Sequence, residues 1–415
     1  MSDNQSNQTC VIIGASHGGV NCAFNLRKEG WKGGIVIIDR DPAFPYHRPP
    51  MSKAYLTSDE SIEKYMLKSA DAYEKEEITL MLGVGVEKLD TGLCRLSLSN
   101  GESVQYTKLI LATGASPILP PIDGISTARH LYTLRTAQDV EAIKKGLDGS
   151  KKKVVVIGAG YIGLEIAASI RKLGHEVTIL ERESRVLARV TSAETSKFFE
   201  ELHQKEGVQI FTAADVKQIE TIDNTNVVRC LDNNLHQADV IIIGVGVKVN
   251  LELAAQAGLT IENGIKVDKT CQTNKSDIYA IGDCTYHYNS QYSRYVRLES
   301  VQNAVDQSKV VAAVICGKEA AYDAIPWFWS DQFHIKLQIV GLAEGYDELI
   351  VRKESDSEDK FSVWYFRDDE LLSVDAINNA KAYVIGSKVI KERLMIDKEK
   401  LKDSSTELKP ATILL

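Results

Sequence analysis

One local pattern, a short apolar segment followed by a glycine-rich turn and an amphipathic helix, occurs twice in this chain and limits its possible folds. The two copies begin at Cys10 to Gly14 (CVIIG) and at Val154 to Gly158 (VVVIG), about 144 residues apart. Their expected helices and second strands are Val20 to Glu29 with Ile35 to Asp39, and Ile162 to Leu173 with Glu176 to Glu181. Each copy predicts a βαβ unit of a buried parallel sheet, and the spacing indicates two nucleotide-binding domains.

Further apolar segments extend this pattern along the chain. Lys108 to Ala115, Val240 to Gly244 and Ile278 to Asp283 are expected to be buried strands, and Arg297 to Val314 is expected to be a helix. From Pro326 onward the pattern becomes aromatic and alternating, as in Lys336 to Val340 and Phe361 to Phe366, which is typical of antiparallel strands. We expect a third domain there, ending in a loosely held tail over the last fifteen residues.

Composition excludes several classes of function. The 415 residues carry 49 Lys and Arg against 57 Asp and Glu, a net charge of -8, so general binding to nucleic acid or to anionic membranes is not expected. The seven cysteines are scattered and suggest neither a metal site nor a disulfide framework. With no signal-like start and no long apolar stretch, we expect a cytoplasmic protein with no bound metal.

The second glycine-rich turn predicts an NAD site. Gly158, Gly160 and Gly163 match G-x-G-x-x-G between a strand and a helix, where backbone N–H groups can approach a pyrophosphate. Glu181, 23 residues after Gly158, can accept hydrogen bonds from the ribose and repel a 2′-phosphate, which favours NADH over NADPH. Three arginines close to Glu181 could still tolerate that phosphate, namely Arg182, Arg185 and Arg189. The alternative is a tight turn without a ligand.

The first turn predicts a second dinucleotide site. It runs from Gly14 to Gly19, with Ser16 in place of the second glycine, and serine is small enough for a pyrophosphate to approach. Asp39, 25 residues after Gly14, is suited to a ribose. His17 is expected to face solvent in the loop. Two such sites on one chain suggest electron relay between a nicotinamide and a flavin.

These residues resemble the FAD-dependent, NAD(P)H-using pyridine nucleotide-disulfide reductase superfamily, and within it the ferredoxin reductases of bacterial oxygenase systems (the putidaredoxin-reductase-like group). The resemblance covers nearly the whole chain. It rests on Gly14 to Gly19, Arg48 to Lys53 with Leu56, Ala112 to Gly114, Gly158 to Glu165, Tyr279 to Asp283, Arg297 to Ala304 and Pro326 to Gln332.

The resemblance implies an α/β protein with two Rossmann-like domains, arranged as in glutathione reductase, and a C-terminal α+β domain. The FAD domain would be discontinuous, over residues 1–120 and 250–325, with the NAD domain at 121–249 and the C-terminal domain at 326–415. Residues implied for FAD are Gly14, Ser16, His17, Gly18, Gly19, Asp39, Arg48, Lys53, Ala112, Thr113, Gly114, Arg135, Asp283, Glu299, Ser300, Val301 and Trp329. Residues implied for NAD are Gly158, Gly160, Tyr161, Ile162, Gly163, Glu165, Glu181, Arg182, Arg189, Val245 and Gly246.

The resemblance also implies the catalytic pair. Lys53 and Glu165 would pair beside the flavin, where a cation stabilises an anionic reduced ring and the carboxylate restrains the lysine. The alternative is an ordinary surface lysine and a helix-facing glutamate. Trp329 would lie near the flavin, or otherwise in the core of the third domain. Val249 stands where the family often has proline, which leaves the shape of the nicotinamide loop open.

The activity implied is hydride transfer from NADH to FAD, followed by single-electron transfers to an acidic 2Fe-2S ferredoxin that serves an oxygenase. No cysteine lies between Cys22 and Cys94, so no thiol accepts electrons at the flavin, and Cys10 and Cys22 are expected to be buried small hydrophobes. Candidate docking cations are Arg294, Arg297 and Lys336, each of which could instead be an ordinary solvated charge.

Three other functions remain open. The acceptor could be rubredoxin or a small oxidant such as monodehydroascorbate or a quinone. The chain could be a sensing flavoprotein similar to apoptosis-inducing factor, which acts through a long-lived NADH–flavin complex. It could also be a plain NAD-dependent dehydrogenase, which would be colourless.

Overall fold

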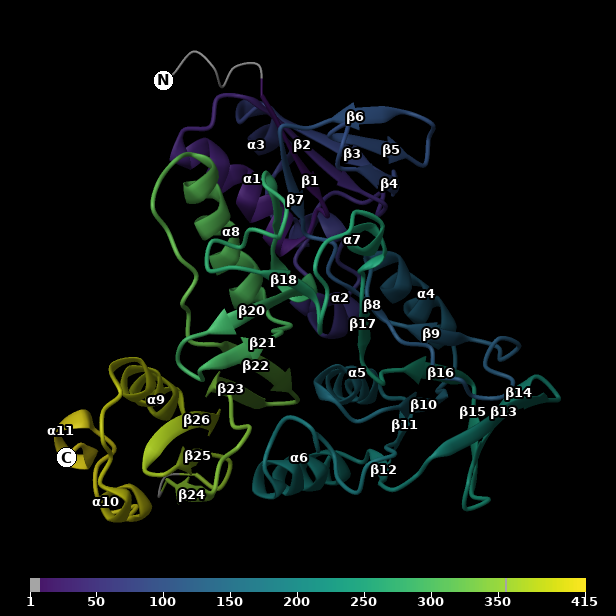
Figure 1. Cartoon of the computed structure of the whole chain (residues 1–415). Helices are drawn as coiled ribbons and strands as arrows, with labels where there is room; N and C mark the ends of the chain where they lie inside the picture. The colour runs from purple at the N-terminus through teal and green to yellow at the C-terminus, as the bar shows by residue number, and fades with distance from the viewer. Residues whose placement is uncertain (1–7, 355–356) are drawn as a thin grey trace. The chain divides into compact units, whose positions relative to one another are not determined.

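The computed structural model describes residues 8–354 and 357–415, which form two compact units (Figure 1). Unit 1 comprises Met1–Pro49, Glu60–Ser116 and Val247–Ala324, and unit 2 comprises Pro50–Asp59, Pro117–Gly246 and Ile325–Leu415. The three-domain division with boundaries at residues 120, 249 and 325 stays a prediction.

Unit 1 is built on a parallel five-stranded sheet in the order β19-β7-β1-β2-β3. Its strands are β1 (Thr9–Ile13), β2 (Gly34–Asp39), β3 (Ile78–Leu82), β7 (Lys108–Leu111) and β19 (Ile278–Ala280). Helices α1 (His17–Glu29) and α8 (Val301–Ile315) pack against each other and against this sheet. This confirms the first predicted βαβ unit, and α8 begins four residues later than predicted because Ser300 caps it by accepting a hydrogen bond from the Asn303 N–H.

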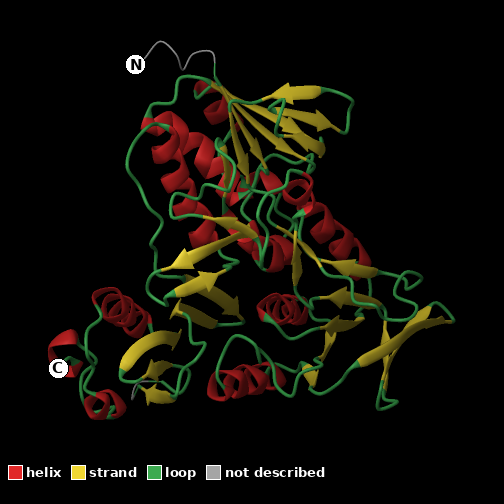
Figure 2. Cartoon of the chain, in the orientation of Figure 1, coloured by secondary structure: helices red, strands yellow, loops and turns green. Residues whose placement is uncertain are grey.

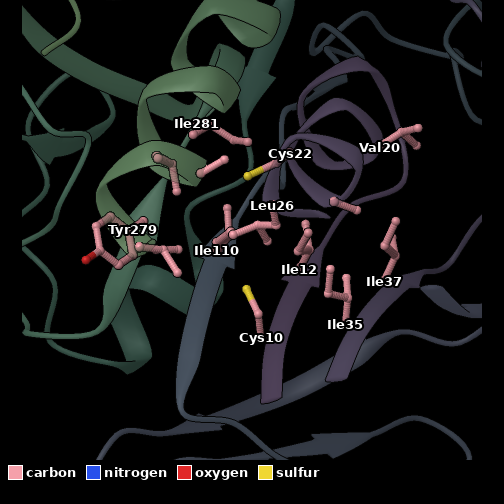
Figure 3. Packing of buried hydrophobic residues seen from close by; sticks show 14 of the residues in the cluster. Cys10, Ile12, Val20, Cys22, Leu26, Ile35, Ile37, Ile110, Tyr279 and Ile281 are labelled. Atoms are coloured by element: carbon pink, nitrogen blue, oxygen red, sulfur yellow. The ribbon is translucent and has the colours of Figure 1, made fainter. Parts of the chain in front are cut away.

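One core cluster of unit 1 lies between α1, α8 and one face of the sheet, and a second is formed by the alternate residues of the same strands. Figure 3 shows Ile12, Ile35 and Ile37 pointing from the strands toward Leu26 of α1. The thiols of Cys10 and Cys22 lie in the same cluster, fully buried, and burial raises the pKa of both. The prediction that these two cysteines are buried hydrophobes is confirmed.

Smaller elements complete unit 1. Its antiparallel sheet contains β4 (Val86–Asp90), β5 (Arg95–Leu98) and β6 (Ser103–Gln105). A second small sheet contains β18 (Ile265–Val267), β20 (Thr285–Asn289) and β21 (Arg294–Val296), and β8 (Ala115–Pro117) pairs with β17 (Val247–Val249). The short helices are η2 (Ile62–Tyr65), α3 (Ala70–Lys75), α7 (Glu252–Gln256) and η3 (Gly282–Cys284).

Unit 2 contains the second predicted βαβ unit, in a parallel sheet ordered β12-β11-β10-β16-β9. Its strands are β9 (Leu131–Thr133), β10 (Lys153–Ile157), β11 (Glu176–Leu180), β12 (Gln209–Phe211) and β16 (Val240–Ile243). Its helices are α4 (Ala137–Leu147), α5 (Tyr161–Lys172) and α6 (Ala193–Lys205), with η1 (Pro49–Ser52) and α2 (Ala54–Thr57) in the segment before them. The strands β13 (Val216–Ile222), β14 (Thr225–Cys230) and β15 (Leu235–Ala238) form a small antiparallel sheet.

The rest of unit 2 is an antiparallel sheet covered by helices, as the alternating pattern predicts (Figure 2). The sheet contains β22 (Trp327–Gln332), β23 (Ile335–Gly341), β24 (Glu348–Lys353), β25 (Phe361–Arg367) and β26 (Glu370–Ile377). Three helices follow: α9 (Ala380–Glu392), α10 (Lys398–Lys402) and α11 (Pro410–Ile413).

The prediction of a loosely held C-terminal tail is wrong. Leu401, Leu408 and Ile413 are buried in the core of this part of unit 2. The segment is polar overall, but these three widely spaced apolar side chains are enough to anchor it. Among residues 8–354 and 357–415, no helix has the length and apolar character needed to cross a membrane.

A buried arginine also holds this segment, which gives a test of the packing. The guanidinium of Arg352 on β24 is 1% exposed and donates to the backbone carbonyl oxygens of Leu401, Asp403 and Thr406 at 3.0, 2.9 and 2.6 Å. Its Nε also contacts Glu354 at 3.1 Å.

Replacing Arg352 by methionine should lower the free energy of unfolding of unit 2 by about 3 kcal/mol, because the buried carbonyl oxygens lose their donor. Urea titration followed by tryptophan fluorescence measures the loss. Lys353→Met, an exposed change on the same strand, is the control, and equal stability of the two variants would contradict this account.

Candidate functional site

The first glycine-rich turn, in unit 1, brings β1 and α1 so close together that side chains are excluded. A Cβ on Gly14, where φ is +114°, would lie 2.2 Å from the carbonyl oxygen of Ala112, and one on Gly19 would lie 1.9 Å from the carbonyl oxygen of Gly14. A Cβ on Gly18 would meet the side chains of Ile281 and Ala304 at 3.4 and 3.6 Å, which is an ordinary contact distance. Gly14 and Gly19 therefore need glycine for packing alone.

Asp39 and Arg48 lie around this turn. One oxygen of Asp39 accepts a hydrogen bond from the Ala15 N–H at 2.5 Å and the other from the Asp41 N–H at 2.9 Å. The Nε atom of Arg48 lies 3.4 Å from the hydroxyl of Ser16, which begins α1 and makes no side-chain cap to the helix. A carboxylate suited to ribose and a guanidinium suited to phosphate thus flank a helix N-terminus.

His17 does not face solvent, so that prediction is wrong. It is the first residue of α1 and only 6% exposed, and its Nε2 atom lies 3.3 Å from Nδ1 of His47. Burial, and then the charge of Lys68, lower the pKa of His47. The helix begins earlier than the apolar periodicity indicates, and this draws His17 into the packed turn.

The other residues predicted for FAD in unit 1 lie just after the carboxyl ends of strands in the same sheet or at the start of α8. Ala112, Thr113 and Gly114 follow β7, Asp283 follows β19, and Glu299, Ser300 and Val301 begin α8. Asn250 secures the loop after β7, because its N–H donates to the Gly114 carbonyl at 3.0 Å and its side chain donates to the Thr113 carbonyl at 2.8 Å.

These features fit the dinucleotide half of FAD. The turn has space for backbone N–H groups to face a pyrophosphate, the first turn of α1 has no acidic residue, and Arg48 is beside it. Lys53, Arg135 and Trp329, also predicted for FAD, belong to unit 2.

The second glycine-rich turn, in unit 2, is packed as closely as the first. A Cβ on Gly158 would lie 2.5 Å from the Gly244 carbonyl oxygen, and one on Gly163 would lie 2.1 Å from the Gly158 carbonyl oxygen. Glu181 accepts a hydrogen bond from the Ala159 N–H at 2.6 Å. Gly160 differs, because an added Cβ would meet no protein atom within 4 Å. Its lack of a side chain therefore leaves open space, which fits close approach by a pyrophosphate.

The next two residues begin α5. The ring of Tyr161 packs on that of Phe328 with centroids 4.7 Å apart, and its buried hydroxyl has no hydrogen-bond partner among the residues that the structure describes. Burial raises the pKa of Tyr161. Ile162 is 47% exposed.

The arginines near Glu181 differ in how far local contacts hold their side chains. Arg185 donates to the carbonyl oxygens of Ala188 and Ser192 at 2.8 and 3.2 Å, so it is engaged in local structure. Arg182 is exposed and contacts Glu183 at 3.3 Å. Arg189 is exposed beside Gly246, which with Val245 forms the loop after β16.

Lys53 and Glu165 form an ion pair within unit 2. The Nζ atom of Lys53 lies 2.5 Å from Oε2 of Glu165, with side chains 22% and 2% exposed. Glu165 projects from the second turn of α5, seven residues after Gly158, and its Oε2 also accepts from the Ser52 hydroxyl at 2.6 Å. The two side chains therefore form the predicted ion pair, and its catalytic role stays a prediction.

Several residues around this pair were not predicted. Ser169 on α5 donates to the Ser52 carbonyl oxygen at 2.6 Å, and Ser330 on β22 donates to Oε1 of Glu165 at 2.7 Å. Trp329, next to Ser330, is half-buried and packs on Trp327 with ring centroids 5.6 Å apart. Ser52 and Ser330 lie inside sequence motifs, but nothing in those motifs indicates that the two hydroxyls meet one carboxylate.

Comparison with known proteins agrees with this geometry. The model of the family described as pyridine nucleotide-disulphide oxidoreductase matches residues 8–308, and the one described as reductase C-terminal matches residues 327–412. Putidaredoxin reductase of Pseudomonas putida is 41% identical over 409 residues, 97% of this chain and 96% of the relative. Rubredoxin-NAD(+) reductase of the same organism is 37% identical over 373 residues, 89% of this chain and 96% of the relative.

A solved structure gives the same result. The reductase in the covalent putidaredoxin reductase–putidaredoxin complex matches with a TM-score of 0.93 and 39% identity, over 98% of both chains. The chain belongs to the pyridine nucleotide-disulphide oxidoreductase family. Within it, the chain is an FAD-containing oxidoreductase that uses NAD(P)H and is related to the ferredoxin reductases.

The contrast between two glycines tests the NAD site. Gly160→Ala should fold normally, because the methyl group meets no protein atom, yet weaken NAD⁺ binding by about tenfold or more by occupying the space for the pyrophosphate. Gly163→Ala should lower thermal stability instead, because its Cβ collides with backbone. Calorimetric titration and thermal melts measure both. Unchanged NAD⁺ affinity in Gly160→Ala would contradict the assignment.

Proposed function

We propose that this protein is an NADH-dependent ferredoxin reductase that delivers electrons to a 2Fe-2S ferredoxin of an oxygenase system in the cytoplasm. The observation that carries the proposal is the buried Lys53–Glu165 pair, which joins the segment after Arg48 to the helix of the NAD turn. A cation held in this way by a nucleotide-binding helix is suited to electron transfer from a nicotinamide.

The overall reaction balances in atoms and electrons. NADH releases a hydride and becomes NAD⁺, and its two electrons reduce two ferredoxin molecules by one electron each, with release of one proton. Bound FAD supplies the conversion between two-electron and one-electron chemistry. The chain itself binds and aligns the partners, and the stretch between Cys22 and Cys94 contains no cysteine that could accept electrons from the flavin.

Two side chains have proposed catalytic roles. The Lys53 ammonium group places a positive charge where electron density accumulates. The Glu165 carboxylate limits where that ammonium group can lie, because it accepts its hydrogen bond at 2.5 Å from a nearly fully buried position.

An acidic ferredoxin needs a local cationic surface, since the whole chain has a charge of -8. Of the predicted docking residues, Lys336 on β23 is exposed, whereas Arg297 pairs with Glu299. We therefore propose Lys336 as a partner contact. The relatives named rubredoxin-NAD(+) reductase support rubredoxin as the alternative acceptor.

The assay that tests this function follows NADH oxidation by the flavin-loaded protein under anaerobic conditions. With a 2Fe-2S ferredoxin present, the ferredoxin should bleach with two equivalents reduced per NADH. Rubredoxin is the matched comparison. Flavin reduction without electron transfer to any member of a varied ferredoxin panel would contradict the proposal and favour a small oxidant or a sensing role.

The preference for NADH should depend on the charge of Glu181. Glu181→Gln keeps an oxygen that can accept from the Ala159 N–H but no longer repels a 2′-phosphate, so the kcat/KM ratio of NADH to NADPH should fall by about tenfold. Glu176→Gln, at the opposite end of β11, is the control. An unchanged ratio in Glu181→Gln would show that another residue sets the preference.

A further inference from the structure

A second set of buried polar side chains approaches Glu165 from the side opposite Lys53. The Lys53 and Ser52 donors both contact Oε2, at 2.5 and 2.6 Å. The other oxygen, Oε1, accepts from the hydroxyl of Ser330 at 2.7 Å. Ser330 is fully buried on β22, so a strand of the C-terminal sheet supplies part of the environment of this carboxylate.

The hydrogen bonds continue beyond Ser330. The side-chain N–H of Gln332, also on β22, donates to the Ser330 oxygen at 3.2 Å. The Gln332 carbonyl oxygen lies 2.9 Å from Nε2 of His203 on α6. Gln332 and His203 are both fully buried, and the His203 ring packs edge-on against Phe333.

The donor and acceptor groups that take part fix the direction of each hydrogen bond in this series. Because the Gln332 oxygen faces His203, the imidazole must carry its proton on Nε2. Burial lowers the pKa of His203 to about 4, so the ring is neutral at neutral pH, and within residues 8–354 and 357–415 its Nδ1 has no hydrogen-bond partner. Every hydrogen therefore points toward Glu165, from His203 through Gln332 to Ser330 and then to the carboxylate.

We propose that Ser330, Gln332 and His203 are positioning residues that set the orientation of the Glu165 carboxylate and, through it, of the Lys53 ammonium group. The inference rests on the proposed role of the Lys53–Glu165 pair. Buried polar groups are costly without hydrogen bonds, so the contacts among Ser330, Gln332 and His203 favour one orientation of each side chain. It gives the C-terminal sheet and α6 a function at the catalytic pair in addition to packing.

Ser330→Ala tests the inference in the flavin-loaded protein. The change removes the only described donor to Oε1, which frees the carboxylate to turn and loosens Lys53. The rate constant for reduction by NADH in stopped flow should fall about tenfold with little change in NAD⁺ affinity. Reductive methylation of Lys53, followed by peptide mass spectrometry, should become about fivefold faster.

Two matched variants separate positioning from packing. Ser330→Thr keeps the hydroxyl and should restore both values. Ser373→Ala removes a fully buried hydroxyl from β26 of the same sheet, where it donates to the Val340 carbonyl oxygen, and should leave both values unchanged. If Ser330→Ala matches Ser373→Ala in both measurements, the inference is overturned.

A double-mutant cycle shows whether Ser330 acts through Glu165. In a Glu165→Gln background, Ser330→Ala should have little further effect on the reduction rate. A full tenfold loss in that background would overturn the inference. None of these measurements involves a ferredoxin, so their failure is distinct from failure of the ferredoxin assay.

The wild-type protein offers a test that needs no variant. Nitrogen-15 NMR of histidine-labelled protein should show His203 as the neutral Nε2–H tautomer at pH 7. His203→Gln, which retains a donor for Gln332, identifies the resonance by its loss. A His203 proton on Nδ1 would contradict the direction of the chain and overturn the inference.

Discussion

The arrangement of Lys53, Ser52 and Ser330 depends on one buried carboxylate, that of Glu165. Glu165 is 2% exposed, and burying a carboxylate is costly unless donors surround it, which here are Lys53, Ser52 and Ser330. Those donors come from two stretches of unit 2, the segment 50–59 and strand β22, and the carboxylate itself is on helix α5. The charge of one side chain therefore requires that these stretches fold together.

The two glycine-rich turns depend instead on the space around their backbone. Gly14, Gly19, Gly158 and Gly163 are needed because a neighbouring backbone carbonyl oxygen lies within collision distance of any side chain, whereas Gly160 leaves an opening. The acids Asp39 and Glu181 end their strands in the same way and each ties the turn through a backbone N–H. Close packing thus shapes each turn, and the free helix N–H groups provide its affinity for phosphate.

Most of the fold could be predicted because its signals are local. The paired βαβ units, the antiparallel C-terminal strands and the buried Cys10 and Cys22 follow from apolar patterns and glycine spacing. His17 was misplaced because periodicity does not define where a helix begins, and the ordered C-terminal segment depends on a few apolar contacts and on Arg352. The meeting of Ser330, Gln332 and His203 joins residues more than 120 positions apart, and no local pattern reports such a contact.

The rate constant for reduction of the flavin-loaded protein by NADH tests most directly whether Lys53 and Glu165 act as one catalytic unit. It is measured in Lys53→Met, Glu165→Gln and the double variant. If the pair acts as a unit, each single change should slow reduction strongly and the double variant should be little slower than the worse single one. Losses that simply multiply in the double variant would show that the two side chains act independently and would contradict the account.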